Sequence, residues 1–174
     1  MSSLFDWLRF LFGVDGSNPA TSPRGAKIDR VAPWLYIGPA LPADALADLS
    51  ARGVTHVLDL RAEDSDDPVA MERLGLRWRR IPILDREPPE DAQLESIIDW
   101  LDSEADPSGE QAVYIHCHAG AGRTPTVAIA LLMHQHLTLA ESRRLVFAAR
   151  PGVAPTEAQM AWLEALEARL RPPA

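Results

Sequence analysis

Two residue types that soluble proteins use freely are almost missing from this chain. Its 174 residues include one cysteine, Cys117, and one lysine, Lys27, although 17 residues are lysine or arginine. A single cysteine cannot form an internal disulfide, so the chain is not a disulfide-stabilised secreted scaffold, and we expect a reducing, cytoplasmic location. The net charge of −8 leaves no broad basic field, so we expect no nucleic acid partner.

Long apolar runs are also missing. The aromatic N-terminal segment SLFDWLRFLFG is too short to span a bilayer and is interrupted by Asp6 and Arg9. We interpret residues 1–27 as a short helix and a linker, and we expect this helix to pack on the domain in preference to a membrane. The remaining residues, 28–174, suit one domain with its own core, which we expect to be monomeric.

Strand and helix patterns alternate along residues 28–174. Apolar, β-branched runs predict strands at 34–38, 54–60, 76–83 and 112–117. Helical patterns occupy 41–53, the segment after Pro88 and Pro89, and the apolar stretch that follows residue 124. The sequence therefore predicts a single α/β domain with a small, mostly parallel central sheet flanked by helices.

Two further helices are predicted in the last third of the chain. Thr138 with Glu141, and Thr156 with Gln159, have the spacing of capping boxes, each at the start of an apolar periodic segment. A capping box accounts for Thr156 and Gln159 without any role in catalysis.

The most informative segment, HCHAGAGRT at 116–124, lies between the strand predicted at 112–117 and an apolar helix. A glycine-containing turn at a helix N-terminus points backbone N–H groups at one spot, where the helix dipole also favours an anion. Cys117 at the mouth of such a turn is expected to be a thiolate and a nucleophile. The guanidinium of Arg123 can bind two phosphate oxygens. The predicted phosphate-binding residues are His118, Ala119, Gly120, Ala121, Gly122 and Arg123.

HCHAGAGRT resembles the HCxxGxxR[ST] loop of protein tyrosine and dual-specificity phosphatases. Three other stretches are similar, in the same order, to the small atypical dual-specificity members: LYIGPALPADALADLSARGVTHVLDLRAE, IPILDREPPE and RPGVAPTEAQ. The resemblance covers most of residues 28–170 and implies the phosphotyrosine protein phosphatase II-like fold. It implies hydrolysis of phosphotyrosine, with phosphoserine and phosphothreonine as further substrates, through a phosphocysteine intermediate and without a cofactor.

The resemblance also implies a general acid that protonates the leaving oxygen. Asp85 stands at the matching place in IPILDREPPE. Glu87, Glu90 and Asp91 are alternatives in the same segment, although the last two have the pattern of residues in the first turn of a helix.

Three further side chains are expected to take part in this chemistry, Thr124 as a catalytic residue and His116 and Gln159 as supporting residues. Thr124 could donate a hydrogen bond to the sulfur and help it to leave. In the family His116 supports the loop by hydrogen bonds, and Thr156 and Gln159 would stand close to the active-site loop.

Other interpretations compete with these. His116 and His118 could suggest a metal, but zinc needs three or four ligands and no partner motif is present, so we expect none. Asp59 and the acidic run at 63–67 are interpreted as loop and solvent-facing residues. A phosphatase acting on a phosphoinositide, nucleotide or sugar phosphate, and an inactive phosphate-binding module, are the alternative functions. The absence of lysine from the loop weighs against a highly charged lipid.

Overall fold

The structure is a computed structural model that describes residues 27–105 and 111–171 of the chain. The helix predicted near the N-terminus lies outside these residues. In the described part, the strands are β1 (Asp29–Ala32), β2 (Leu35–Pro39), β3 (His56–Arg61), β4 (Arg77–Ile83) and β5 (Val113–Cys117). The helices are η1 (Ala43–Ala45), α2 (Ala47–Ala51), α3 (Pro68–Arg73), α4 (Asp91–Ser103), α5 (Arg123–His134), α6 (Leu139–Ala149) and α7 (Glu157–Leu170).

The strands form one sheet in the order β1-β2-β5-β3-β4. β1 pairs with β2 in the antiparallel sense, and the other neighbours are parallel. This arrangement confirms the predicted α/β class and the mostly parallel sheet. Because β5 lies at the centre, all five of its residues are buried, and its carboxyl end projects the following loop from the middle of the fold.

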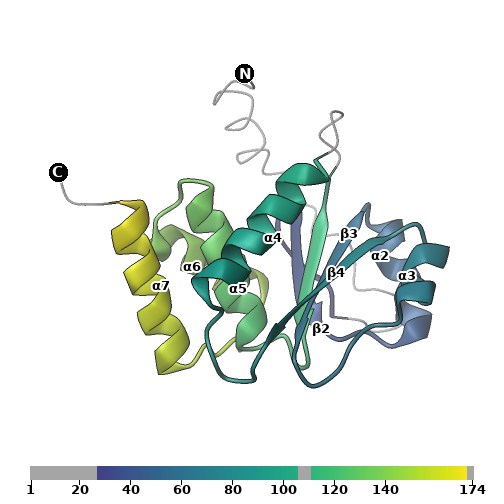
Figure 1. The fold of residues 1–174 in the computed structure, drawn as a ribbon, viewed down its shortest axis with the longest axis horizontal. Coiled ribbons are helices and arrows are strands. Elements are labelled where there is room, and N and C mark those ends of the chain that lie inside the picture. Colours follow the sequence, from purple (N-terminus) through teal and green to yellow (C-terminus); the bar gives the residue numbers. More distant parts are fainter. Residues whose placement is uncertain (1–26, 106–110, 172–174) are drawn as a thin grey trace.

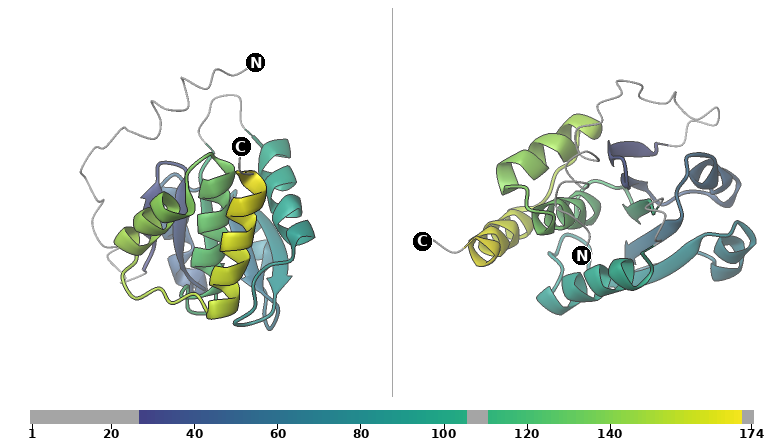
Figure 2. Two further views of the ribbon diagram at one scale, coloured as in Figure 1. Left: turned by 90° about the vertical axis from the view of Figure 1, so that its left-hand side faces the viewer. Right: turned by 90° about the horizontal axis from the view of Figure 1, so that it is seen from above.

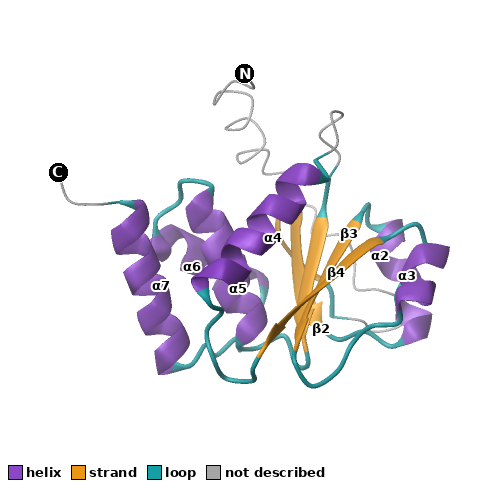
Figure 3. Ribbon diagram, in the orientation of Figure 1, coloured by secondary structure: helices purple, strands orange, loops and turns teal. Residues whose placement is uncertain are grey.

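Helices cover both faces of the sheet, as Figures 1 and 3 show. α4, α5, α6 and α7 enclose the larger apolar core on one face, and α2 and α3 enclose a smaller one on the other. Figure 2 shows α5 between the sheet and the outer helices. This position explains why α5 is buried at nearly every residue. Among the described helices, none has the length and apolar character needed to cross a membrane.

Three elements differ from the prediction. β1 was not predicted, because four residues with mixed burial carry too little periodic signal. The helix predicted in 41–53 is divided into η1 and α2. α3 was also not predicted: the Asp67 side chain accepts a hydrogen bond from the Val69 N–H at 2.9 Å and Pro68 occupies the first turn, so a residue interpreted as solvent-facing loop starts a helix.

Candidate active site

The loop of residues 118–122 connects the end of β5 to the start of α5, so Cys117 and Arg123 stand at its two ends. Gly120 has a φ of 66°. A Cβ at this position would lie 2.4 Å from the carbonyl carbon and oxygen of Gly38. Only glycine therefore fits where the loop passes over the end of β2.

Four successive carbonyl groups of this loop are held from outside it. The carbonyl of His118 accepts from the N–H of Ala40 at 3.1 Å, and that of Ala121 accepts from the N–H of Ala154 at 2.8 Å. The Arg150 guanidinium donates to the carbonyls of Ala119 and Gly120 at 3.1 and 3.0 Å. Because C=O and the following N–H of a trans peptide point in opposite directions, these bonds turn the N–H groups of 119–122 away from the supporting elements, as a phosphate cradle requires.

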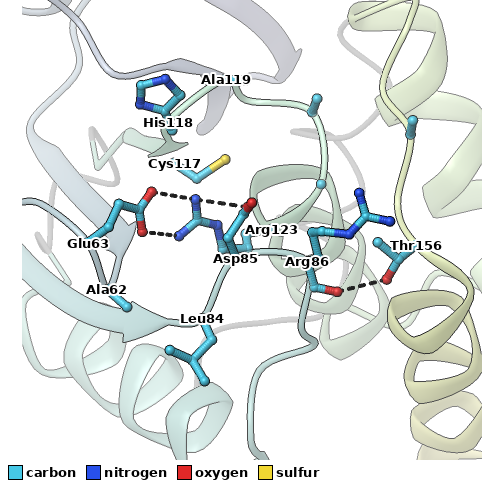
Figure 4. Close-up of a pocket in the computed structure, with 13 residues that line it drawn as sticks. Ala62, Glu63, Leu84, Asp85, Arg86, Cys117, His118, Ala119, Arg123 and Thr156 are labelled. Carbon is cyan, nitrogen blue, oxygen red and sulfur yellow. Dashed lines mark hydrogen bonds and ion pairs between the residues drawn. The ribbon is translucent and has the colours of Figure 1, made fainter.

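A cavity of about 630 Å³ opens over this loop. Cys117, Arg123 and Asp85 line it, together with loop residues His118, Ala119, Ala121 and Gly122. The structure therefore brings the predicted nucleophile, clamp and acid into one pocket. The Cys117 side chain is a free thiol at its inner end, and Figure 4 shows the sulfur above the guanidinium of Arg123.

Arg123 is held in place by a carboxylate that the sequence did not identify. Its two terminal nitrogens donate to the two carboxylate oxygens of Glu63, each at 2.7 Å (Figure 4). Hydrogen bonding from Arg123 lowers the pKa of Glu63 to about 2. Arg123 Nη1 also donates to the carbonyl of Ile83 at 3.0 Å. Because the Arg123 side chain is only 2% exposed, these contacts fix the plane of its guanidinium before a phosphate binds.

Two of the residues interpreted as loop and solvent-facing, Asp59 and Asp66, belong to an ion-pair network with Arg61 and His116, which corrects the prediction for these two. Glu63, Asp64, Ser65 and Asp67 are exposed, as expected. Asp59 is fully buried, and both of its carboxylate oxygens accept from Arg61 at 2.9 Å. Burial raises the pKa of Asp59, but the hydrogen bonds from Arg61 and the neighbouring charges lower it further, so the net pKa is below its ordinary value. Asp66 accepts from Arg61 at 2.7 Å and lies 2.7 Å from Nε2 of His116.

This ion-pair network also bears on the metal question. The ligand atoms of Asp59, Asp66 and His116 lie within 4.8 Å of one another. Both carboxylates already bind the guanidinium of Arg61, which supplies the positive charge that they face. His118 is exposed and is not part of this group, so the structure does not assemble the His116 and His118 pair. The Nδ1 of His116 instead lies 3.4 Å from the carbonyl of Cys117, which fits a role in supporting the loop.

The structure separates Asp85 from its three alternatives. Asp85 lines the pocket, 74% exposed, with Oδ1 3.2 Å from Nη2 of Arg123. Glu90 is the N-cap of α4, and Asp91 begins that helix and pairs with Arg169 at 2.8 Å. Glu87 is not among the residues that line the pocket.

Thr156 and Gln159 form the predicted capping box at the start of α7. They also hold the turn that follows β4: Thr156 Oγ1 donates to the carbonyl of Arg86, and Gln159 Nε2 donates to the carbonyl of Glu87, both at 2.9 Å. Gln159 is fully buried and its side chain lies close to Gly122. The hydroxyl of Thr124 is buried without a hydrogen-bond partner among the described residues, so its expected bond to the sulfur is not formed here.

Comparisons with known proteins agree on one family. The family described as "Polymorphic toxin system, DSP-PTPase phosphatase" matches residues 35–136. Human dual specificity protein phosphatase 26 is 32% identical over 147 residues, covering 82% of this chain and 68% of its own. Human dual specificity phosphatase 28 is 31% identical over 159 residues, covering 90% and 86%.

Solved structures give the same result. The active form of Tk-PTP superposes with a TM-score of 0.72 at 29% identity, covering 82% of this chain and 97% of that one. Human DUSP28 superposes with a TM-score of 0.69 at 29% identity, covering 88% and 99%. The matched segment 35–136 contains the pocket residues Glu63, Asp85, Cys117 and Arg123. The chain belongs to the dual-specificity phosphatases, a family of cysteine-dependent phosphoric monoester hydrolases.

Proposed function

We propose that this chain dephosphorylates proteins at tyrosine, and also at serine and threonine, with Cys117, Arg123 and Asp85 as the reacting groups. The observation that carries the proposal is that a single pocket holds the free thiol, the fixed guanidinium and an exposed carboxylate 3.2 Å from that guanidinium. The relatives support the substrate class, because dual specificity protein phosphatases 26 and 2 are named as protein phosphatases of dual specificity.

Each group has a defined part in the proposed reaction. The Cys117 thiolate attacks phosphorus, the bond from phosphorus to the leaving oxygen breaks, and Asp85 gives its proton to that oxygen. The loop N–H groups and Arg123 stabilise the charge on the phosphoryl oxygens. Water then attacks the phosphocysteine and gives a proton to Asp85. The S–P bond breaks, which releases inorganic phosphate and restores the thiolate.

Supporting residues keep these groups in position. Glu63 orients Arg123, Arg150 holds the loop carbonyls, and Thr156 and Gln159 hold the turn that carries Asp85. No step in this scheme uses a metal. A cytoplasmic location and a monomeric state stay predictions from the sequence.

The experiment compares wild-type protein with Cys117→Ser on a phosphotyrosine peptide and on phosphoserine and phosphothreonine peptides. The variant should lose about 10⁴-fold or more in kcat, because an alcohol at the head of the loop is not ionised. It should still bind inorganic phosphate, since the backbone and Arg123 remain. Acid-quenched wild-type protein should carry one phosphoryl group on Cys117 by mass spectrometry. Near wild-type hydrolysis by C117S would contradict the covalent mechanism.

A further inference from the structure

A second arginine lines the pocket, on the side of Thr156 and away from Glu63, as Figure 4 shows. This residue is Arg86, which follows the proposed general acid directly. Its side chain is exposed, and within residues 27–105 and 111–171 its guanidinium makes no hydrogen bond or ion pair. Arg123, by contrast, already has two carboxylate partners.

The backbone at Arg86 adopts a conformation that is unfavourable for a residue with a long side chain. The N–H of Glu87 donates to the carbonyl of Leu84 at 3.1 Å, so residues 84–87 form a turn with Arg86 at its third position. Arg86 has a φ of 67°, a conformation that glycine or asparagine adopts at lower cost. The hydrogen bond from Thr156 to the Arg86 carbonyl holds this conformation. A side chain kept at such a position, beside the reacting groups, is a candidate for function.

The distribution of charge in the chain also singles out Arg86. The chain carries 25 acidic against 17 basic residues, so a free cation at the mouth of the pocket stands out from its surroundings. Arg150, another arginine close to the loop, pairs with Asp29 at 2.6 Å and donates hydrogen bonds to two loop carbonyls. Of the arginines near the pocket in the described part of the chain, Arg86 is therefore the one that a substrate can reach without breaking an existing pair.

We propose that Arg86 binds a second anionic group of the substrate, a carboxylate or a second phosphate beside the phosphorylated residue. The inference rests on the proposed function and adds a preference for substrates whose phosphorylated residue has an acidic neighbour. The exposed guanidinium can bind either anion through two parallel hydrogen bonds.

The test uses phosphotyrosine peptides that differ only in the neighbouring residues: glutamine, glutamate or phosphoserine. The wild-type protein should hydrolyse the anionic peptides with a kcat/KM about three- to tenfold above the glutamine peptide, the size expected of one exposed ion pair. The gain should appear in KM and should shrink at high salt, which screens exposed charges. A larger gain for phosphoserine than for glutamate would identify the second phosphate as the preferred anion.

Two variants isolate the side chain. Arg86→Gly keeps the positive φ without strain and should bring the ratio of anionic to glutamine peptide close to one. Arg86→Glu should invert the ratio. Arg144→Gln, on the exposed face of α6 and outside the pocket, removes the same charge and should keep the wild-type ratio.

The outcomes separate this inference from the proposed function. Equal ratios in wild type and R86G, or a wild-type ratio of one, would overturn the second-anion site and leave the phosphatase assignment intact. Hydrolysis of an aryl phosphate but of none of the peptides would overturn the protein substrate, and the second-anion site with it.

Discussion

The loop at 118–122 and the turn at 84–87 line the same pocket but are built in opposite ways. Apart from His118, the loop consists of small residues, and its carbonyls are held by Ala40, by Arg150 and by Ala154. The turn presents exposed side chains, including Asp85, and is held through two backbone carbonyls. Recognition of the phosphoryl group therefore depends on backbone geometry, whereas proton transfer and recognition of the rest of the substrate depend on side chains. Changes to the two segments should have different signatures.

Among changes within these two segments, the largest effect should come from enlarging the loop at Gly120, where it has no room for a side chain. Gly120→Ala should reduce kcat/KM by a hundredfold or more on every substrate, because its Cβ would lie 2.4 Å from the Gly38 carbonyl and the loop must move. The control is Gly122→Ala, whose Cβ would meet the side-chain amide of Gln159, with Oε1 nearest at 3.3 Å, and which should cost a few-fold. Steady-state kinetics with an aryl phosphate and a peptide measure both. Similar losses in the two variants would show that the loop is not fixed by its backbone.

In the turn, the effect of replacing Asp85 should depend on the leaving group of the substrate. Asp85→Asn should lower kcat on the order of a hundredfold for an alkyl phosphate and much less for an activated aryl phosphate, because only the alkoxide needs a proton as the bond breaks. Glu87→Gln is the matched control, since Glu87 lies two residues away and outside the pocket. A selective loss on the alkyl phosphate in E87Q, with none in D85N, would reassign the acid.

Acid pH should weaken the fold at the end of the sheet opposite to both segments. Burial lowers the pKa of His56, at the start of β3, to about 4, and its Nε2 has no partner among the described residues. The folded state favours the neutral ring of His56, so this residue makes a contribution to the free energy of unfolding on the order of 3 kcal/mol above pH 6.5. The contribution is lost as the pH falls from 6.5 towards 4.

Chemical denaturation at several pH values would measure this loss, and His56→Gln should flatten the slope between pH 6.5 and 4. The Glu63 carboxylate, with a pKa of about 2, should stay paired with Arg123 across that range. An unchanged slope in H56Q would exclude His56 as its source.

Removal of divalent metal ions should have no effect on activity. Chelation by EDTA should leave kcat/KM unchanged in wild-type protein, because Arg123 and the loop supply the charge stabilisation and Arg61 already binds both Asp59 and Asp66. Loss of activity that a divalent ion restores would revive the metal reading, with Asp59, Asp66 and His116 as its ligands.

The sequence predicted those parts of the site that are close together along the chain. Cys117, Arg123 and the loop between them form a local motif, and Asp85 was named by resemblance. The capping boxes of α6 and α7 are also local patterns, and the structure confirms them.

The pairs that the sequence missed join distant residues. Glu63 and Arg123 are 60 positions apart, and Asp66 and His116 are 50 apart. One signal was available: Asp59 and Arg61 lie in a strand, HVLDLR, with apolar residues on both faces. Charges in a strand buried on both faces must be paired, so a solvent-facing interpretation was the weaker one.

The capping box of α7 has a consequence beyond the helix that it starts. The hydroxyl of Thr156 and the amide of Gln159 belong both to the first turn of α7 and to the turn that carries Asp85 and Arg86. The docking of α7 and the ordering of the turn that carries Asp85 therefore depend on the same two hydrogen bonds, so each requires the other. A molecule in which α7 has come away has lost the hydrogen bonds that hold the turn carrying Asp85 and Arg86, and it is therefore less able to complete a turnover.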